Sequence, residues 1–491
     1  MRKLFLSVLS GLLLAFAWPE IGVFPLIFIG FIPLLILEED ISKSEEKMSW
    51  KVFGYSFITF FIFNIITTYW VWHASTGGAF AAFVINALLM SVAFVLFHKV
   101  KRVLASKRIY FALLFFWISL EYLHLHWELA WPWLTLGNVF ATVPKIVQWY
   151  EYTGVLGGSL WILTINILLF RWWNSERIKK QLIFPFTILL MPIIISFLIT
   201  VEYDKEKMIE VVIVQPNIFN KEEKTFDIDR FISLSESKIT SSTELLLAPE
   251  TVLQGTRNEN NVMKYSDIDK LLKLQEKYPK LNILIGAATI KKNNIYNSAI
   301  FMSKDKNLFY HHKTKLVPGA EAIPYPSLFN RFKDLLSIKL DGVAGNYDRE
   351  KDITIFSIDK VDILPLICYE SVFGELLRRK KSNIIAIITN DGWWKNTAGF
   401  KQHFQYARLR AIEQRRSIIR SANTGISGLI DPNGEVIEQT NWKEEIAINV
   451  KVPLNESVTF YNKFGDYIGR LSGFLAAMLF IVAFVKGRLK K

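Results

Sequence analysis

Residues 364–370 read LPLICYE. An apolar run ends there at Cys368, the single cysteine among the 491 residues, and polar residues follow it at once. Short apolar runs with polar boundaries are typical of buried strands, and functional groups are often presented where strands give way to loops. The stretch therefore predicts a buried strand that ends in a candidate nucleophile.

Two other stretches supply groups that match the thiol. Residues 245–250 read LLLAPE, and residues 310–318 read YHHKTKLVP. A lone cysteine is more often inert, because free cysteine packs as a small hydrophobe. A carboxylate that takes the thiol proton, together with a lysine that stabilises the developing negative charge, favours nucleophilic catalysis instead. We predict the catalytic set Glu250, Lys313 and Cys368, with Lys315 as the alternative lysine.

Further residues near these stretches are candidates for supporting roles. Tyr369 can contribute its backbone N–H to an oxyanion hole, and Glu370 or Glu321 can hold the lysine. A second set follows the apolar run 383–389 and is predicted to bind substrate, with the tryptophans as an apolar wall for a lipid chain: Asn390, Trp393 and Trp394. His311 and His312 have no partner ligands at zinc-like spacing, so the sequence predicts neither a metal nor another cofactor.

Hydrophobic residues make up 51% of the chain and crowd into residues 1–201 and 471–485. A membrane-spanning helix needs roughly 20 apolar residues. Eight windows approach that length, at about 4–17, 21–37, 52–72, 79–97, 109–123, 154–170, 182–201 and 467–485. The first window also resembles a signal peptide, but a second span follows it directly and its retention gives an even count. We predict a polytopic helical membrane bundle of about eight spans with one large insert.

The net charge of +13 does not indicate nucleic-acid binding, because many basic residues lie between the apolar windows. They form three clusters: Lys99, Lys101, Arg102, Lys107 and Arg108; Arg171, Arg177, Lys179 and Lys180; and Lys486, Arg488, Lys490 and Lys491. Basic loops favour the cytoplasmic side of a membrane. This rule predicts cytoplasmic termini and an insert outside the cytoplasm, with the mixed charges of residues 38–51 as its weakest point. A single cysteine allows no intramolecular disulfide, so it leaves the compartment open.

The insert alternates apolar runs with amphipathic, charged segments. We predict buried strands at 209–215, 244–248, 282–288, 363–367 and 383–389. We predict helices at 226–240, 265–278 and 402–420, where apolar residues recur at intervals of three and four. This alternation indicates a layered α/β domain whose candidate site residues lie at strand ends.

With these residues in view, the chain resembles the apolipoprotein N-acyltransferases, a family whose catalytic domain belongs to the nitrilase, or carbon–nitrogen hydrolase, superfamily. Four stretches carry the nitrilase part of the resemblance: 248–251, 313–318, 368–370 and 389–393. The acyltransferase part is carried by 132–137, 214–217, 296–299, 402–403, 407–411 and 420–425. The resemblance covers nearly the whole chain and implies an αββα fold for the insert.

The family pattern also implies the catalytic triad. It maps to Glu250, Lys313 and Cys368, since the lysine of the pattern stands five residues before Pro318 and eight before Glu321. The pattern thereby selects Lys313 over Lys315. The chain departs from the pattern in two places, because residues 317–321 read VPGAE where many members have VPFGE, and Gly392 replaces a usual alanine.

The resemblance implies N-acylation of the α-amine of the diacylglyceryl-cysteine at the start of an apolipoprotein, the final step of lipoprotein maturation. The acyl chain would come from the sn-1 position of a phospholipid, typically phosphatidylethanolamine, through a thioester on Cys368 in a ping-pong reaction. The implied domains are a bundle at 1–201, a periplasmic catalytic domain at 202–455, and a return segment with the last span and a basic cytoplasmic tail at 456–491. The implied location is the bacterial inner membrane.

Two alternatives remain at this level. A membrane-tethered nitrilase-type amidase or hydrolase would use the same thioester and pass the acyl group to water. A transporter or scaffold with a ligand-binding domain is disfavoured, because few charged residues lie inside the predicted spans and transport usually requires them.

Overall fold

The computed structural model describes residues 1–44, 48–106, 109–176, 178–199, 201–203, 206–218, 227–329 and 347–489. The chain divides into two compact units. The helical unit comprises Met1–Trp72, Thr76–Thr200 and Phe464–Lys491, and the sandwich unit comprises His73–Ser75 and Val201–Lys463. Some residues of the predicted features lie outside the described residues: Lys107, Arg108, Arg177, Phe226, Lys490 and Lys491.

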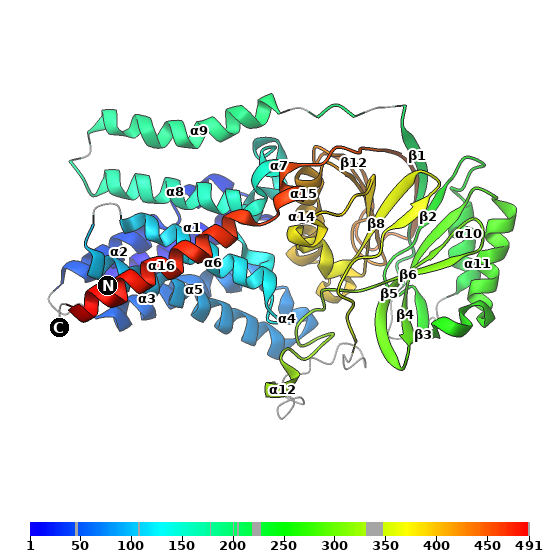
Figure 1. Ribbon diagram of the computed structural model, residues 1–491, viewed down its shortest axis with the longest axis horizontal. Helices are drawn as coiled ribbons and strands as arrows, with labels where there is room; N and C mark the ends of the chain where they lie inside the picture. Colours follow the sequence, from blue (N-terminus) through cyan, green and yellow to red (C-terminus); the bar gives the residue numbers. More distant parts are fainter. Residues whose placement is uncertain are drawn as a thin grey trace. The chain divides into compact units, whose positions relative to one another are not determined.

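Six helices in the described part of the helical unit are long and apolar enough to cross a membrane, by length and composition alone. They are α3 (Ser49–Thr68), α5 (Thr76–Leu104), α6 (Ala112–His126) preceded by the 3-10 turn η2 (Ile109–Phe111), α8 (Val155–Trp173), α9 (Ile183–Leu198) preceded by η6 (Lys179–Leu182), and α16 (Tyr467–Leu489) (Figure 1). Most apolar side chains of α9 and α16 are exposed, as expected for helices that contact lipid tails.

The predicted count of eight spans is not confirmed. The window 4–17 forms α1 (Arg2–Ala17), a helix of 16 residues. The window 21–37 is not a single helix, because it divides into η1 (Phe24–Phe28) and α2 (Ile32–Lys43). Each of these two elements has a proline in its first turn, where a missing N–H is tolerated, whereas the interior of a continuous helix would not accept it.

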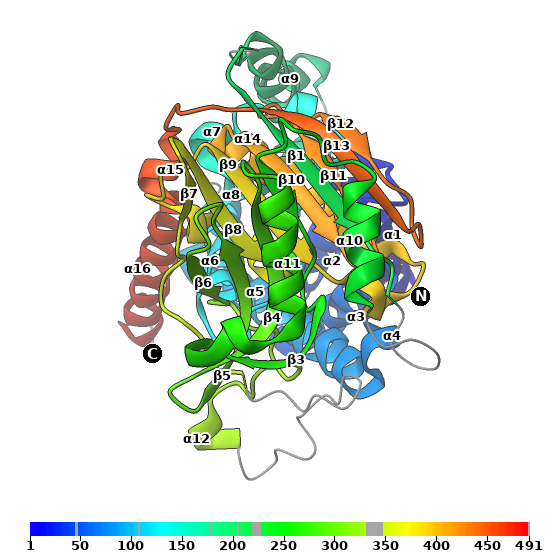
Figure 2. The ribbon, with the colours of Figure 1, turned by 90° about the vertical axis from the view of Figure 1, so that its right-hand side faces the viewer.

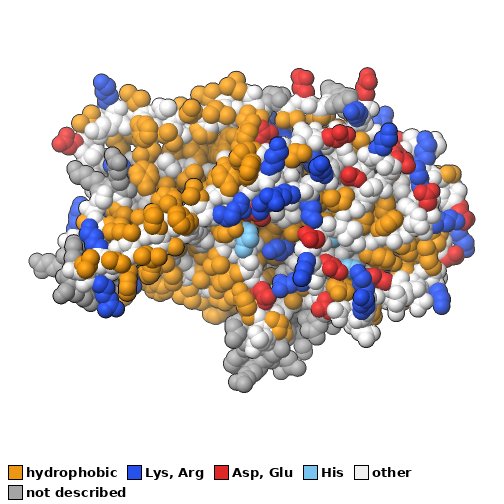
Figure 3. Space-filling view, viewed as in Figure 1, with side chains coloured by type: hydrophobic (Ala, Val, Ile, Leu, Met, Phe, Trp, Pro, Cys, Tyr) orange, Lys and Arg blue, Asp and Glu red, His pale blue; other side chains and the backbone are white. Residues whose placement is uncertain are grey.

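The remaining helical segments up to residue 153, and one near residue 460, are short. They are α4 (Val71–Ala74), η3 (Pro132–Leu134), η4 (Leu136–Thr142), η5 (Pro144–Ile146), α7 (Tyr150–Thr153) and α15 (Phe460–Phe464). In the face shown in Figure 3, hydrophobic side chains dominate the surface of the helical unit, whereas charged side chains of both signs are scattered over the sandwich unit. This contrast agrees with a membrane bundle and a separate soluble domain.

The sandwich unit contains two sheets. The first has the order β13 (Ile446–Pro453), β1 (Met208–Gln215), β2 (Leu245–Leu247), β4 (Asn282–Lys291), β5 (Asn294–Met302) and β6 (Leu308–His312), and β3 (Leu253–Asn258) also pairs with β4. The second has the order β12 (Val436–Gln439), β11 (Gly428–Ile430), β10 (Ser417–Ala422), β9 (Ile384–Thr389), β8 (Val361–Ile367) and β7 (Phe356–Ile358).

Helices cover the outer face of each sheet. The helices of the unit are α10 (Ile228–Glu236), α11 (Ser266–Lys277), α12 (Pro326–Phe329) and α14 (Ala398–Gln414), with 3-10 turns η7 (Glu259–Lys264), η9 (Cys368–Val372), η10 (Gly374–Leu377) and η11 (Asp391–Trp394). Figure 2 shows α10 and α11 lying over the first sheet. Side chains of α14 pack against the second sheet. The order of layers is therefore αββα, which confirms the predicted fold class.

Strand periodicity explains why the layers form. In β1, Val211 and Ile213 belong to the core between the sheets, while Val212 and Val214 face the core under α10 and α11. The residues of β9 alternate in the same way between the inner core and the core under α14. A strand with both faces buried reads as a continuous apolar run, and each fully buried aliphatic side chain stabilises the fold by about 1.5–3 kcal/mol.

The predicted strands are present with small shifts at their ends, but one predicted helix is wrong at its end. We expected a helix over 402–420, whereas α14 ends at Gln414 and Ser417–Ala422 forms β10. Arg415 adopts a left-handed conformation, with φ 49° and ψ 50°, which ends the helix. The following residues Ile418 and Ile419 are fully buried in the second sheet.

Candidate active site

Cys368 lies at the carboxyl end of β8, where the chain turns sharply into η9. Its φ is +50°, in the left-handed region that costs a non-glycine residue about 1–2 kcal/mol. Strain of this kind persists only where the surrounding structure fixes the backbone, and it is common at active sites. Because β8 and β9 are parallel and Ile367 pairs with Ile388, the polar residues after both strands meet at one edge of the sheet.

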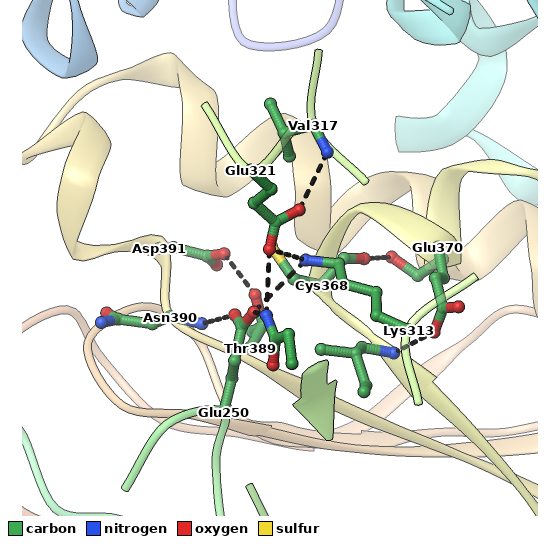
Figure 4. A network of polar contacts seen from close by, with 12 residues as sticks. Glu250, Lys313, Val317, Glu321, Cys368, Glu370, Thr389, Asn390 and Asp391 are labelled. Carbon is green, nitrogen blue, oxygen red and sulfur yellow. Dashed lines mark hydrogen bonds and ion pairs between the residues drawn. The ribbon is translucent and has the colours of Figure 1, made fainter. Parts of the chain in front are cut away.

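Lys313 follows β6 directly and is buried, with 1% of its surface exposed. Its Nζ donates to Oε1 of Glu321 at 2.8 Å and lies 3.3 Å from Oε1 of Glu250 (Figure 4). The Asn297 side chain donates from Nδ2 to the same two oxygens, at 2.9 Å and 2.7 Å. We call these four residues, Glu250, Asn297, Lys313 and Glu321, the lysine network. It holds one ammonium between two carboxylates.

Glu250 is placed by backbone contacts on both sides. Its Oε2 accepts a hydrogen bond from the backbone N–H of Asn390 at 3.1 Å, which ties it to the loop after β9. On β4, Gly286 approaches so closely that a Cβ there would lie 2.6 Å from the Glu250 Cα. A side chain at position 286 would therefore push the carboxylate away from the lysine.

Glu321 is held on Lys313 by a tight turn. Its Oε2 accepts from the backbone N–H of Val317 at 2.8 Å, and its own N–H donates to the Val317 carbonyl at 3.0 Å. Gly319 within this turn has φ +78°, which favours glycine. The departure from the family pattern at positions 319 and 320 thus leaves the glutamate on the lysine.

Glu370 does not hold the lysine side chain, in contrast to one of our two expectations. Its Oε1 accepts from the N–H and the hydroxyl of Thr314 at 2.6 Å and 2.7 Å. Its Oε2 accepts from the Ile367 N–H at 2.8 Å and lies 3.1 Å from His311 Nε2. Burial opposes its charge, but His311 and these donors lower its pKa. Glu370 therefore ties the backbone beside Lys313 to the backbone beside Cys368.

A second buried network touches the backbone of Cys368. Ser371 Oγ donates to the Cys368 carbonyl at 2.7 Å, and His403 Nε2 lies 3.2 Å from the same oxygen. Asp391 lies behind the imidazole, with Oδ1 at 2.9 Å from His403 Nδ1, and its Oδ2 accepts from Arg420 at 2.7 Å. We call Ser371, Asp391, His403 and Arg420 the carbonyl network.

The electrostatics of the site set the protonation of the thiol. Burial raises the pKa of Cys368 far above its usual range, Glu250 raises it further, and Lys313 lowers it. The thiol is therefore neutral at rest and needs a base to become a nucleophile. Burial would lower the pKa of Lys313, but Glu250 and Glu321 raise it well above its usual value. The lysine thus stays cationic when the reaction creates negative charge.

The other predicted site residues surround this centre. Tyr369 is buried and packs edge-on against Phe373. Asn390 contacts Glu250 through its backbone, while its side chain accepts from Gly392 N–H at 3.2 Å and caps η11. Trp394 packs edge-on against His403, with ring centroids 5.5 Å apart, and Trp393 lies half-buried in the same turn. Their roles in substrate binding stay predictions.

Sequence reasoning did not assign the buried polar residues that surround Glu250, Lys313 and Cys368. These are Asn297 in the lysine network and all four members of the carbonyl network. The available signal was polarity inside otherwise apolar elements, as at Asn297 in β5 and Arg420 in β10. Among the described residues, no group of three or more His, Cys, Asp or Glu side chains is placed to hold a metal ion.

Comparison with known proteins places this site in a family. The carbon–nitrogen hydrolase model matches residues 210–459, which is more than half of the chain, and the model of the apolipoprotein N-acyltransferase N-terminal domain matches residues 10–168. The chain belongs to the carbon–nitrogen hydrolase family, in the branch formed by the apolipoprotein N-acyltransferases. This membership and the six apolar helices make it a bacterial membrane protein.

Individual relatives match over nearly the full length. The apolipoprotein N-acyltransferase of Chlorobaculum tepidum is 27% identical, and the match covers 99% of this chain and 97% of that protein. The one from Thermotoga maritima is 26% identical over 99% of this chain and 94% of that protein. Among solved structures, a nitrilase-superfamily member from Saccharomyces cerevisiae is 19% identical with a TM-score of 0.38, covering 50% of this chain and 90% of that one.

Proposed function

We propose that the protein transfers an acyl chain from the sn-1 position of a phospholipid to the α-amine of the N-terminal diacylglyceryl-cysteine of an apolipoprotein. The observation that carries the proposal is geometric: Glu250 lies 3.3 Å from Lys313 and accepts from the N–H of Asn390, which follows β9 at the same edge of the sheet where the single cysteine follows β8. Family membership supports the same reaction, because the full-length relatives are named apolipoprotein N-acyltransferases. The proposed catalytic residues are Cys368 as nucleophile, Glu250 as base and Lys313 as the cation that stabilises the oxyanion.

In the first half-reaction, Glu250 takes the proton of the Cys368 thiol while Sγ attacks the ester carbonyl carbon. Lys313 and the N–H of Tyr369 stabilise the negative charge that develops on the carbonyl oxygen. The carbon–oxygen bond of the ester then breaks, and protonated Glu250 returns its proton to the departing oxygen. The products are a thioester on Cys368 and a lysophospholipid.

In the second half-reaction, the neutral α-amine of the apolipoprotein attacks the thioester carbon. Glu250 accepts the proton that the amine loses, the carbon–sulfur bond breaks, and the thiol is restored with that proton. Since donor and acceptor use the same carbonyl position in turn, the kinetics are ping-pong. Phosphatidylethanolamine is the proposed donor, and the triacylated lipoprotein is the proposed final product of maturation.

We place the catalytic domain, within residues 202–455, on the periplasmic side of the bacterial inner membrane, with both termini in the cytoplasm. The basic residues at the ends of α5, α8 and α16 support this orientation, because such residues favour the cytoplasmic side. Both lipid substrates would then reach the site from the outer leaflet.

A product assay tests the proposal. Purified protein in mixed micelles receives phosphatidylethanolamine labelled in its sn-1 chain and a synthetic diacylated lipopeptide with a free α-amine. We expect label on the lipopeptide amine and none with Cys368→Ala. Cys368-dependent release of labelled free fatty acid, with no label on the lipopeptide, would assign the protein to the hydrolases instead.

A matched control uses the second lysine of the motif. Lys315 is half-buried, its Nζ lies 5.1 Å from the Phe373 ring centroid, and it lies outside the lysine network. Lys315→Gln should keep most of the transfer that Lys313→Gln loses. Equal losses in the two variants would contradict the assignment of Lys313.

A further inference from the structure

The carbonyl oxygen of Cys368 receives two side chains, although one donor would satisfy a buried carbonyl. Ser371 Oγ lies at 2.7 Å and His403 Nε2 at 3.2 Å, and both side chains are buried. A carbonyl oxygen only accepts hydrogen bonds, so a proton on His403 Nε2 is what can be donated to it. Ser371 Oγ and His403 Nε2 are also 2.9 Å apart, which makes the three groups one cluster.

The imidazole of His403 is fixed from behind by charged groups. Asp391 Oδ1 lies 2.9 Å from Nδ1, and Thr389 donates to the same oxygen at 2.9 Å. Arg420 donates to the other oxygen of Asp391 at 2.7 Å and also to the Ile426 carbonyl. Asp391 and Arg420 are both fully buried. Arg420 Nη2 also lies 3.0 Å from His403 Nδ1, so both members of a buried ion pair contact the ring.

The peptide group between Cys368 and Tyr369 links the position of the Cys368 carbonyl to the direction of the Tyr369 N–H. A trans peptide is planar, so its C=O and the next N–H point in opposite directions, and the described residues contain no cis peptide bond. Whatever fixes the Cys368 carbonyl therefore also fixes the direction of the Tyr369 N–H. The left-handed φ of Cys368 is unfavourable for a non-glycine residue, so the backbone keeps this orientation only where surrounding contacts hold it.

We propose that His403 and Ser371 are positioning residues that aim the Tyr369 N–H at the oxyanion by holding the Cys368 carbonyl. This inference rests on the proposed function, because it concerns the oxyanion of acyl transfer. Neither residue needs to touch substrate. Their effect is on the negative charge that forms when a carbonyl is attacked, and it is absent from reactions of the thiol that form no oxyanion.

Reactions of the thiol with and without an oxyanion distinguish a positioning role from a purely structural one. Acylation of Cys368 by phosphatidylethanolamine passes through an oxyanion, whereas alkylation by iodoacetamide displaces iodide at a saturated carbon and forms none. A variant that misaims the amide should therefore lose acylation and keep alkylation. A variant that damages the fold or the thiol should lose both, and the single cysteine makes alkylation specific for this site.

The experiment measures single-turnover acylation of the full-length protein in mixed micelles over a range of phosphatidylethanolamine concentrations, with iodoacetamide alkylation alongside. The variants are Ser371→Ala, His403→Leu and His403→Gln, whose amide keeps an N–H donor. Ser417→Ala is the matched control, since Ser417 Oγ also donates to a buried carbonyl, that of Pro453, at the opposite end of β10.

Loss of one oxyanion donor lowers turnover by roughly 100-fold or more, so misaiming it should slow acylation about 10-fold in Ser371→Ala and about 100-fold in His403→Leu. We expect an unchanged half-saturating lipid concentration, partial recovery in His403→Gln, wild-type alkylation in all variants, and a wild-type rate for Ser417→Ala.

Acylation of Ser371→Ala and His403→Gln at the rate of Ser417→Ala, or a parallel loss of acylation and alkylation in Ser371→Ala, would overturn the inference. Failure of the wild-type protein to form any Cys368-dependent acyl adduct would instead overturn the proposed function.

Discussion

The lysine network and the carbonyl network lie on two sides of the same cysteine, and both bury charged groups. The lysine network sets two carboxylates against one ammonium, and both Glu250 and Lys313 act electrostatically on the thiol. The carbonyl network pairs one carboxylate with one guanidinium, and its contact with Cys368 is through the backbone carbonyl. In the proposed mechanism the lysine network moves protons and charge, whereas the carbonyl network fixes geometry.

The largest expected effect comes from removing the base. Glu250→Gln should lower acyl transfer by about 10²–10⁴-fold, the usual contribution of a general base. The same change should speed alkylation of Cys368 by iodoacetamide, because Glu250 raises the pKa of the thiol. Transfer and alkylation rates of the two proteins at pH 8 check this. Acyl transfer by Glu250→Gln at the wild-type rate would contradict the assignment of Glu250 as the base.

Removing the cation should act in the same direction on both reactions. Lys313→Met should lower acyl transfer by about 10²–10³-fold, since it removes a charge that faces the oxyanion. It should also slow alkylation at pH 8, because Lys313 lowers the pKa of the Cys368 thiol. Alkylation at or above the wild-type rate would contradict the electrostatic role of the lysine.

Breaking the carbonyl network should mainly lower the stability of the protein. Asp391→Asn leaves Arg420 buried without its counter-charge, which costs about 3–5 kcal/mol in the free energy of unfolding. Urea unfolding of the full-length protein in detergent, followed by tryptophan fluorescence, measures this. Ser417→Ala is the control, because it removes a buried side-chain hydrogen bond without leaving a buried charge unpaired.

The Asp391–Arg420 pair should contribute less to the stability of the protein at acid pH. Burial alone would raise the pKa of Asp391, but Arg420 and His403 lower it from 3.8 to about 2. A lowered pKa stabilises the fold fully above the unfolded value and loses this contribution as the pH falls from about 4 through 2. The stability difference between wild type and Asp391→Asn should therefore shrink only below about pH 4. Shrinkage between pH 5 and 7 would contradict the pairing.

Substitutions at two glycines should have smaller effects on acyl transfer, and the two effects should differ. Gly286→Ala should lower transfer by about 10-fold or more, because its Cβ would displace the backbone of Glu250. Gly392→Ala should change transfer less than about 3-fold, since a Cβ there meets only the Asn390 side chain, at 3.1 Å, and ordinary contacts beyond. Transfer rates under identical micelle conditions compare the two, and a larger loss in Gly392→Ala would reverse the expectation.

The sequence allowed prediction of the layers and strand ends because strand periodicity is local. The end of α14 was missed, since the left-handed Arg415 that stops it carries no sequence signal as strong as glycine. The second window failed as a single span because two prolines divide it. Hydropathy averaged over a window does not show where a helix begins, so it does not reveal that a proline starts a new element inside the window.

The other features that could not be predicted depend on contacts between residues far apart in the sequence. The mixed charges of residues 38–51 weakened the orientation argument, but the structure pairs Glu38 and Glu39 with Lys101 and Asp40 with Arg2. The role of Glu370 also depended on pairing, because Thr314 meets it only after the strands have assembled. Side chains separated by dozens of residues cannot be matched by composition or spacing.

In the proposed mechanism the single cysteine carries the acyl group. Intact-mass measurement of the full-length protein after incubation with phosphatidylethanolamine, without acceptor, is the decisive test, with Cys368→Ala alongside. We expect a gain of one acyl chain that hydroxylamine removes and that peptide mapping places on Cys368. An active protein with no adduct, or an adduct that persists in Cys368→Ala, would show that Cys368 does not carry the acyl group.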